Sequence, residues 1–184
     1  MRLFIALKLQ PQVIQSVTDL QTTLKQTGID AKWVESGNLH VTLKFLGEVK
    51  EELLPQAEKI LSGLSSLCKP FRIKTSSLGC FPDIKRPRVL WLGITPMDKP
   101  IEIITYLDKE LAKAGFIPED RKPHPHITLA RIRSSKNVNN LKNAIDSLKI
   151  EEKEWLVSEV SLFKSTLSSS GPVYQEIFKT NLIT

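Results

Sequence analysis

The sequence predicts an α+β, bilobal fold: two duplicated lobes, each with a mainly antiparallel sheet and helices outside, around a central cleft on a pseudo-twofold axis. One reason is the order of the predicted elements, which is strand, helix, strand, helix, strand in both halves of the chain. The other is an equal offset between the halves: His126 minus His40 is 86, and Val89 minus Leu3, in the opening strands, is also 86. This offset indicates an internal duplication, with two unrelated α+β halves of similar length as the alternative.

The chain length favours a single domain. The protein has 184 residues, and one domain takes roughly 100 to 200 residues. Neither half could easily bury both faces of its own sheet, so we expect the halves to pack together. We therefore predict one domain over residues 1–184, with approximate lobes at 1–86 and 87–184 and with strands open to exchange between the lobes.

Apolar periodicity marks each element of the first half in turn. Pro11 is typical of a helix start and Gly28 of a helix end. The Pro- and Gly-containing segment 79–88 indicates a linker or a crossing between lobes. The predicted elements are a buried strand at 2–9, an amphipathic helix from 11 to near 28, a strand at 39–46, a helix at 51–67 and an extended segment at 71–77.

The second half repeats this order. The break between its first helix and its second strand spans residues 115–125, where Gly115 and Pro125 interrupt the periodic pattern. The predicted elements are a strand at 89–94, a helix at 101–114, a strand at 126–132, a polar helix at 138–148 and a strand at 155–163.

Charge and composition narrow the classes of function. The chain carries 26 Lys and Arg against 20 Asp and Glu, a net charge of +6, which suits a polyanionic partner such as nucleic acid and equally suits a plain soluble basic surface. Cys68 and Cys80 form no C-x-x-C pair and have no histidine at zinc-ligand spacing, so we expect no metal, no cofactor and a reducing compartment. The apolar run at residues 3–7 is too short for a secretory signal, and no run approaches the roughly 18 apolar residues of a membrane span. We expect a cytoplasmic monomer with no membrane association.

Two H-x-T-L motifs, at residues 40–43 and 126–129, carry the candidate chemistry. Side chains alternate between the two faces of a strand, so each histidine shares a face with the threonine two residues later while apolar residues take the other face. The same alternation puts Lys44 on the histidine face and Phe45 on the core face. If the pseudo-twofold axis brings the two histidine faces together, one cleft holds two histidines and two threonines.

Such a cleft is suited to in-line displacement at a phosphodiester. One imidazole can accept a proton from the nucleophile while the other donates a proton to the leaving oxygen. Threonine hydroxyls can donate hydrogen bonds to phosphate oxygens as negative charge develops. No metal is required. A lone strand histidine is more often structural, but two of the three histidines at matching positions of a repeat favour catalysis.

These residues and their flanks resemble the two-histidine (2H) phosphoesterases, and within them the RNA 2′,3′-cyclic phosphodiesterases, also described as 2′-5′ RNA ligases. The similar segments are RLFIAL, KWVESGNLHVTLKFLG, HPHITLARI and SLFKSTLSSSGPVYQEI, which together reach from one end of the chain to the other. The resemblance implies a bilobal α+β fold and metal-independent hydrolysis of a terminal RNA 2′,3′-cyclic phosphate to a 2′-phosphate, with reversible 2′-5′ ligation as a further activity. It also implies that His40 is the proton donor and that His126 is the proton acceptor that activates water.

The resemblance extends to the phosphate contacts. Arg131 matches the family's phosphate-contacting arginine, and with Thr42 and Thr128 it is a candidate phosphate ligand. Strand alternation places Arg131 on the face opposite Thr128, so a bulge, a twist or the end of the strand must turn it into the cleft. Lys32 stands where many relatives carry arginine, which weakens any inference of bidentate phosphate binding at that position.

Two further residues have open interpretations. Tyr174 resembles a family position near the cleft and is a candidate for stacking on a terminal base, with ordinary lobe packing as the alternative. His124 and His126 look like a metal pair, but the intervening Pro125 and the absence of nearby cysteines or a carboxylate cluster favour a flanking role for His124.

The sequence leaves two other functions open. The same fold could bind a nucleotide or an RNA end without turnover, although such a binding module has no chemical need for both histidines. Alternatively, the enzyme could act on a small cyclic nucleotide in place of RNA, and the charge of +6 favours the larger anion.

Overall fold

The structure is a computed structural model that describes residues 1–120, 122–169 and 171–183. Its strands are β1 (Arg2–Lys8), β2 (Ala31–Trp33), β3 (His40–Glu48), β4 (Phe71–Phe81), β5 (Val89–Thr95), β6 (His126–Ile132), β7 (Glu154–Val157), β8 (Glu159–Leu167) and β9 (Pro172–Asn181). Its helices are α1 (Pro11–Lys25), α2 (Leu54–Ser62), α3 (Asp98–Lys113) and α4 (Val138–Ser147), with short 3-10 turns at η1 (Ser36–Asn38), η2 (Glu51–Leu53) and η3 (Gly63–Ser66).

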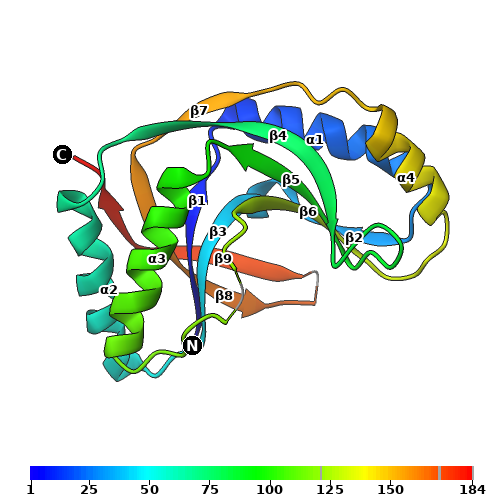
Figure 1. The fold of residues 1–184 in the computed structure, drawn as a ribbon. Coiled ribbons are helices and arrows are strands. Elements are labelled where there is room, and N and C mark those ends of the chain that lie inside the picture. Colours follow the sequence, from blue (N-terminus) through cyan, green and yellow to red (C-terminus); the bar gives the residue numbers. More distant parts are fainter. Residues whose placement is uncertain (121, 170, 184) are drawn as a thin grey trace.

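The strands form one curled sheet that runs through both halves of the chain (Figure 1). The strand order is β7-β4-β5-β6-β3-β1-β8-β9, with β2 beside β6. Neighbouring strands are antiparallel throughout, and β3 meets β6 at the pair Val41 and Ile127. The predicted α+β class with antiparallel strands is therefore confirmed.

Strands from the two sequence halves are interleaved in this sheet. Strand β4 comes from the first half of the chain but lies beside β5, whereas β8 and β9 come from the second half and lie beside β1. The junction of β6 and β3 divides the sheet into two half-sheets, β7-β4-β5-β6 with β2 and β3-β1-β8-β9. Each half-sheet contains strands from both halves of the chain. The lobe boundaries at 1–86 and 87–184 stay a prediction.

The helices cover one side of the sheet in two pairs. Helices α1 and α4 meet where the Asn137 side chain donates a hydrogen bond to the Gly28 carbonyl, and they cover the half-sheet that contains β6 (Figure 1). Helices α2 and α3 meet where the Tyr106 hydroxyl donates to the Ile60 carbonyl, and they cover the half-sheet that contains β3 (Figure 1). The other side of the sheet, which carries no helix, is called the open face below.

Three predicted segments differ from the structure. Residues 79–88 are not a crossing between lobes, because β4 continues to Phe81 and forms a hairpin with β5. The strand predicted at 155–163 is two strands, β7 and β8, interrupted at Ser158, whose carbonyl accepts a hydrogen bond from Leu182. The helix predicted at 51–67 is broken into η2, α2 and η3. Strands β2 and β9 were not predicted, since β2 is very short and β9 has a mixed polar and apolar pattern typical of an exposed strand.

Both histidine strands contain a β-bulge immediately after the threonine. Along β3, Thr42 pairs with Ala6 and Lys44 with Ile5, so that Leu43 is an extra residue. Along β6, Thr128 pairs with Trp91 and Ala130 with Leu90, so that Leu129 is extra. A bulge inserts one residue and reverses the alternation that follows it. The side chains beyond each bulge therefore point to the face opposite the one that simple alternation predicts.

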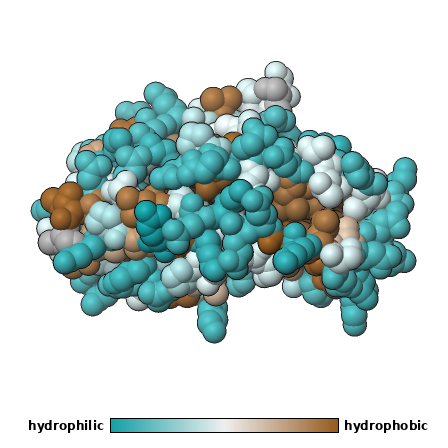
Figure 2. All heavy atoms as spheres, turned by 90° about the horizontal axis from the view of Figure 1, so that it is seen from above, coloured by the Kyte–Doolittle hydropathy of each residue, from teal (hydrophilic) through white to brown (hydrophobic). Residues whose placement is uncertain are grey.

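None of the described helices combines the length and the apolar character required to cross a membrane. On the face shown in Figure 2, hydrophilic side chains cover most of the surface and hydrophobic side chains form small, separate patches.

Candidate active site

His40 and His126 each open a strand at the centre of the sheet. They are the first residues of β3 and β6, which are neighbours, and both side chains are half-buried. Thr42 and Thr128 share their face and are also half-buried. The two imidazoles are close enough that the charge of His126 lowers the pKa of His40. The structure thus brings together the four side chains of the two motifs on the open face.

Backbone carbonyls fix both imidazoles in the same tautomer. Nδ1 of His40 lies 2.7 Å from the Asn38 carbonyl, and Nδ1 of His126 lies 2.6 Å from the His124 carbonyl. A carbonyl oxygen only accepts hydrogen bonds, so Nδ1 must carry the proton in each ring. Nε2 is then the atom that gains and loses a proton in each histidine. In His40 this atom lies 2.9 Å from the Thr42 hydroxyl oxygen.

Burial lowers the pKa of both histidines below the usual value of 6.5. For His40, burial is the largest cause, the Asn38 hydrogen bond opposes it, and His126 adds to it. For His126, burial is again the largest cause, the His124 carbonyl opposes it, and the His124 side chain adds to it. A lowered pKa keeps an imidazole neutral near pH 7, as a proton acceptor requires.

Aromatic rings pack around each histidine. On the β3 side, the Phe4 ring centroid lies 4.9 Å from that of His40, and the Tyr174 ring meets His40 edge-on at 5.4 Å. On the β6 side, Phe81 meets His126 edge-on at 5.0 Å. Trp91 lies over β4 at Gly79, where an added Cβ would approach its ring to 2.2 Å, so glycine leaves the space that this ring occupies. These contacts restrict the orientation of both imidazoles.

The bulge at Leu129 turns Arg131 onto the open face. Leu129 and Ala130 are both buried, and Arg131 beyond them is exposed. The side-chain charge of Arg131 acts on Tyr174, whose pKa is raised by burial and lowered by the charges of Arg131 and Arg2. Lys32, the residue opposite Arg131 on β2, is also exposed. The bulge is the predicted distortion that brings Arg131 onto the histidine face.

The corresponding bulge in β3 corrects two expectations. Lys44, predicted on the histidine face, is 4% exposed and forms an ion pair with Asp108 of α3 on the helix side of the sheet. Phe45, predicted in the core, is 55% exposed. The signal that could have found this lay in the duplication: position 45 corresponds to position 131 at the offset of 86, so a bulge inferred for Arg131 applied equally to Phe45.

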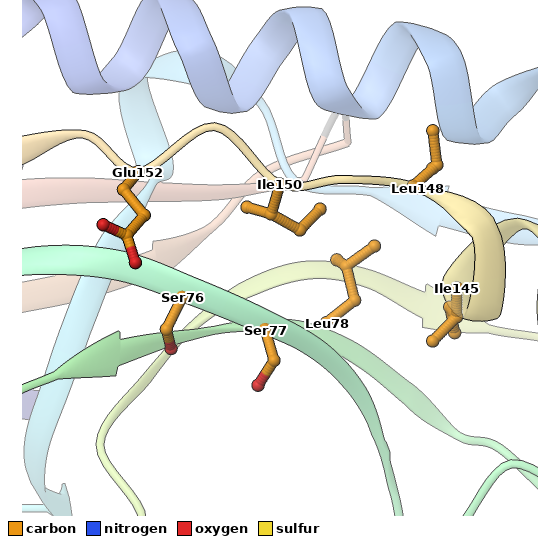
Figure 3. A pocket seen from close by; sticks show the side chains of 7 residues that line it. All are labelled: Ser76, Ser77, Leu78, Ile145, Leu148, Ile150 and Glu152. Carbon is orange, nitrogen blue, oxygen red and sulfur yellow. The ribbon is translucent and has the colours of Figure 1, made fainter.

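His124 supports His126 through its backbone carbonyl, while its own imidazole is exposed and lies 4.7 Å from the Trp91 ring. Within the described part of the chain, no group of three or more His, Cys, Asp and Glu side chains is placed to hold a metal ion. A hollow between β4 and the segment 145–152, shown in Figure 3, lies on the outer side of β4, so that β5 separates it from the histidine strand β6. Its lining contains neither histidine.

A sequence model of one family matches most of the chain. The family is described as LigT like Phosphoesterase, and the match covers residues 7–91 and 95–174. A protein of Aquifex aeolicus named RNA 2′,3′-cyclic phosphodiesterase is 42% identical over 153 residues, covering 79% of each chain. A protein of the same name from Methanothermobacter thermautotrophicus is 36% identical over 181 residues, covering 97% of this chain and 98% of the relative.

Solved structures share the whole fold. A crystal structure of a protein from Thermus thermophilus superposes with a TM-score of 0.82 at 29% identity, over 99% of this chain and 98% of that one. The crystal structure of Escherichia coli LigT complexed with 3′-AMP superposes with a TM-score of 0.75 at 26% identity, over 100% of this chain and 98% of LigT.

Proposed function

The chain belongs to the LigT like phosphoesterase family, and from this we propose that it hydrolyses RNA terminal 2′,3′-cyclic phosphates to 2′-phosphates. Relatives at 36% to 42% identity carry the name RNA 2′,3′-cyclic phosphodiesterase. The observation that supports the proposal most strongly is the matched pair of histidines. Each has Nδ1 bound to a carbonyl, and each therefore has Nε2 available for proton transfer.

In the proposed reaction, a water oxygen forms a bond to phosphorus as the bond from phosphorus to the ribose O3′ breaks. Nε2 of His126 accepts the proton that the water loses, and Nε2 of His40 donates a proton to O3′. The product carries a 2′-phosphate and a free 3′-hydroxyl. The two imidazoles lie on neighbouring strands, which suits an in-line displacement with the nucleophile and the leaving group on opposite sides of phosphorus.

Thr42, Thr128 and Arg131 are the proposed phosphate ligands. Arg131 offers a guanidinium on the same face as the histidines, and a guanidinium can donate two parallel hydrogen bonds to phosphate oxygens. Thr42 already contacts His40 Nε2, so its hydroxyl lies at the point where proton transfer takes place. Lys32, opposite Arg131, adds positive charge at the approach to this site.

Two aromatic residues are proposed to contact the terminal base. Tyr174 packs edge-on against Phe4 and His40. The charges of Arg131 and Arg2 lower the pKa of its hydroxyl, against the larger upward effect of burial. Phe45 is more exposed. The Phe4 ring packs near both residues, with its centroid 4.9 Å from that of His40 and 6.2 Å from that of Phe45. Stacking on an aromatic face tolerates any base, so we propose little base specificity on this side.

Several finer properties are part of the same proposal. When an RNA 5′-hydroxyl replaces water as the nucleophile, the same opening of the ring at O3′ joins the two RNAs through a 2′-5′ phosphodiester, and the reverse of that step cleaves the linkage and restores the cyclic phosphate. A small cyclic nucleotide is the alternative substrate, because the chemistry at phosphorus is the same. We propose that the enzyme acts without a metal or cofactor, as a monomer in the cytoplasm. One chain supplies both histidines, and both cysteines, Cys68 and Cys80, are free thiols.

The test is turnover of an oligonucleotide that ends in a 2′,3′-cyclic phosphate, comparing the wild type with His40→Ala and His126→Ala. General acid and general base catalysis each contribute typically 10²- to 10⁴-fold, so each variant is expected to lose about that factor in kcat. Circular dichroism should show unchanged folding. Wild-type turnover in both variants would refute the catalytic pair, and tight binding of a nucleotide 2′-phosphate without any turnover by the wild type would establish the non-catalytic binding module.

A further inference from the structure

Gln21 is a buried polar residue on a helix that otherwise turns apolar side chains toward the sheet. The buried face of α1 consists of Val13, Val17, Gln21 and Leu24, and Gln21 is 3% exposed. Burying an amide carries a free-energy penalty unless its hydrogen bonds are satisfied. An apolar residue would fill this position without that penalty, so the amide needs a reason to be there.

The amide of Gln21 binds the bulge that turns Arg131. Nε2 of Gln21 donates to the Leu129 carbonyl at 3.0 Å and to the Val34 carbonyl at 2.9 Å. The backbone N–H of Val34 donates to the same Leu129 carbonyl at 2.9 Å. Leu129 is the extra residue of the β6 bulge, so it has no partner residue on β5. Gln21 therefore joins the bulge to the segment that follows β2, from the helix side of the sheet.

The other half of the chain provides an internal comparison. At the offset of 86, position 21 corresponds to position 107, where α3 carries Leu107, a fully buried apolar residue. The β3 bulge has the same place in its strand as the β6 bulge, but the residue turned outward there is Phe45, not an arginine. The amide that binds the bulge backbone is thus present behind the β6 bulge, which orients a cation. Behind the β3 bulge, which orients a phenyl ring, its place is taken by leucine.

We propose that Gln21 is a positioning residue for Arg131, because its amide holds the β6 bulge in the register that keeps the guanidinium on the histidine face. The inference rests on the proposed role of Arg131 in binding phosphate. Loss of the Gln21 hydrogen bonds lets β6 relax toward regular alternation, which directs the side chain at position 131 toward the helix side of the sheet. Gln21 touches no substrate and acts only through β6.

The test is a double-mutant cycle read out by binding. Calorimetry measures the affinity of the protein for adenosine 2′-monophosphate in the wild type, Gln21→Leu, Arg131→Ala and the double variant. Leucine is the residue that the other half of the chain accommodates at this position. Hydrogen bonds to charged groups contribute strongly, and the effects of residues in one network are not additive. Gln21→Leu should therefore weaken binding about tenfold when Arg131 is present and less than about twofold in the Arg131→Ala background. Leu107→Met, at the matching position of α3, is the control and should leave affinity unchanged.

An equal loss in both backgrounds would show that Gln21 acts by general stability, and it would overturn the proposal. If Gln21→Leu does not fold, Gln21→Met carries the same cycle, and failure of both to fold would also overturn it. The readout requires no turnover. A wild type that binds the nucleotide through Arg131 but hydrolyses no cyclic phosphate would refute the proposed function alone, whereas unchanged binding in Arg131→Ala would refute the role of Arg131 and the positioning role with it.

Discussion

Val41 and Ile127 pair directly across the junction of β3 and β6, and each residue follows the histidine of its own half of the chain. Their numbers differ by the same 86 that separates the histidines. The pair therefore joins corresponding positions of the two halves of the chain at the centre of the sheet. Because Val41 and Ile127 are buried, each neighbouring histidine points to the opposite, open face. This one contact places the two imidazoles on the same face of neighbouring strands.

The pH dependence should reflect the lowered pKa values of both histidines. The free enzyme needs one protonated and one neutral imidazole, a state that predominates between the two macroscopic pKa values of the pair. Both are lowered below 6.5 by burial, so kcat/KM should be highest below pH 6.5 and should fall as rising pH removes the donor's proton. A bound phosphate anion favours the protonated form, so the kcat profile should lie at higher pH. Initial rates over roughly pH 5 to 8 check this prediction, which a kcat/KM maximum above about pH 7 would contradict.

Replacing Arg131 of β6 should lower activity far more than replacing Lys44, the buried lysine of β3. Arg131→Ala removes charge-assisted hydrogen bonds to phosphate and should lower kcat/KM about 10- to 100-fold. Arg131→Lys should recover only part of this loss, because lysine lacks the planar pair of donors. Lys44→Met serves as the comparison, since Lys44 lies on the helix side and should influence stability more than rate. Equal losses in kcat/KM for the two sites would argue against the bulge-based assignment.

Phe45 and Tyr174 should differ in their effects on substrate binding. Phe45→Ala removes an exposed ring and should raise KM about 5- to 100-fold if one base stacks on it, as stacking contributes roughly 1 to 3 kcal/mol per base. Tyr174→Phe keeps the ring that packs on His40 and should leave KM nearly unchanged. The comparison uses matched oligonucleotides ending in adenosine or uridine, with a smaller effect for uridine. An unchanged KM in Phe45→Ala would assign the base to another surface.

The ion pair of Lys44 and Asp108 should contribute to stability in a pH-dependent way. Asp108 accepts hydrogen bonds from Lys44 and from the backbone of Glu119, and the Lys44 contact holds its pKa below the usual 3.8. A depressed carboxyl pKa stabilises the fold above the unfolded value, and this contribution is lost as pH falls through the folded value. Asp108→Asn leaves the Lys44 charge buried and should cost on the order of 2 kcal/mol at pH 7.

Urea unfolding at about pH 7 and below about pH 3 measures this contribution. The difference between the wild type and Asp108→Asn should be present at neutral pH and should shrink at the lower pH. Asp83→Asn, in the β4–β5 loop, is the control for loss of one carboxylate. A difference of the same size at both pH values would show that the ion pair does not carry the effect.

The sequence predicted the chemistry more fully than the shape of the sheet. Alternation of side chains was sufficient to place His40 with Thr42 and His126 with Thr128, because the four residues precede the bulges. It failed for Lys44 and Phe45, which follow a bulge. A bulge depends on the register of a neighbouring strand that is distant in sequence, so the strand's own residues do not reveal it. The motif spacing was therefore sufficient to place the two candidate catalytic histidines on one face, while the positions of the residues around them depended on long-range pairing.

The interleaving of strands was similarly beyond local patterns. Strand β4 reads as an extended segment after α2 in either arrangement, and only its partners β5 and β7 show that it belongs to the other half-sheet. Gln21 is a related case. On the helix it occupies an apolar position, and its two backbone partners, 13 and 108 residues away in the chain, become visible only in the folded structure.

Phosphorus NMR of the product tests the paired-histidine reaction most directly. An RNA oligonucleotide ending in a 2′,3′-cyclic phosphate is incubated with the wild type in excess EDTA, and the phosphate resonance is followed to completion alongside His40→Ala and His126→Ala. Metal-independent catalysis by the paired histidines predicts quantitative conversion to a 2′-phosphate by the wild type in EDTA and an unchanged cyclic phosphate with either variant. A 3′-phosphate product, or activity that disappears with EDTA and returns with a divalent ion, would contradict it.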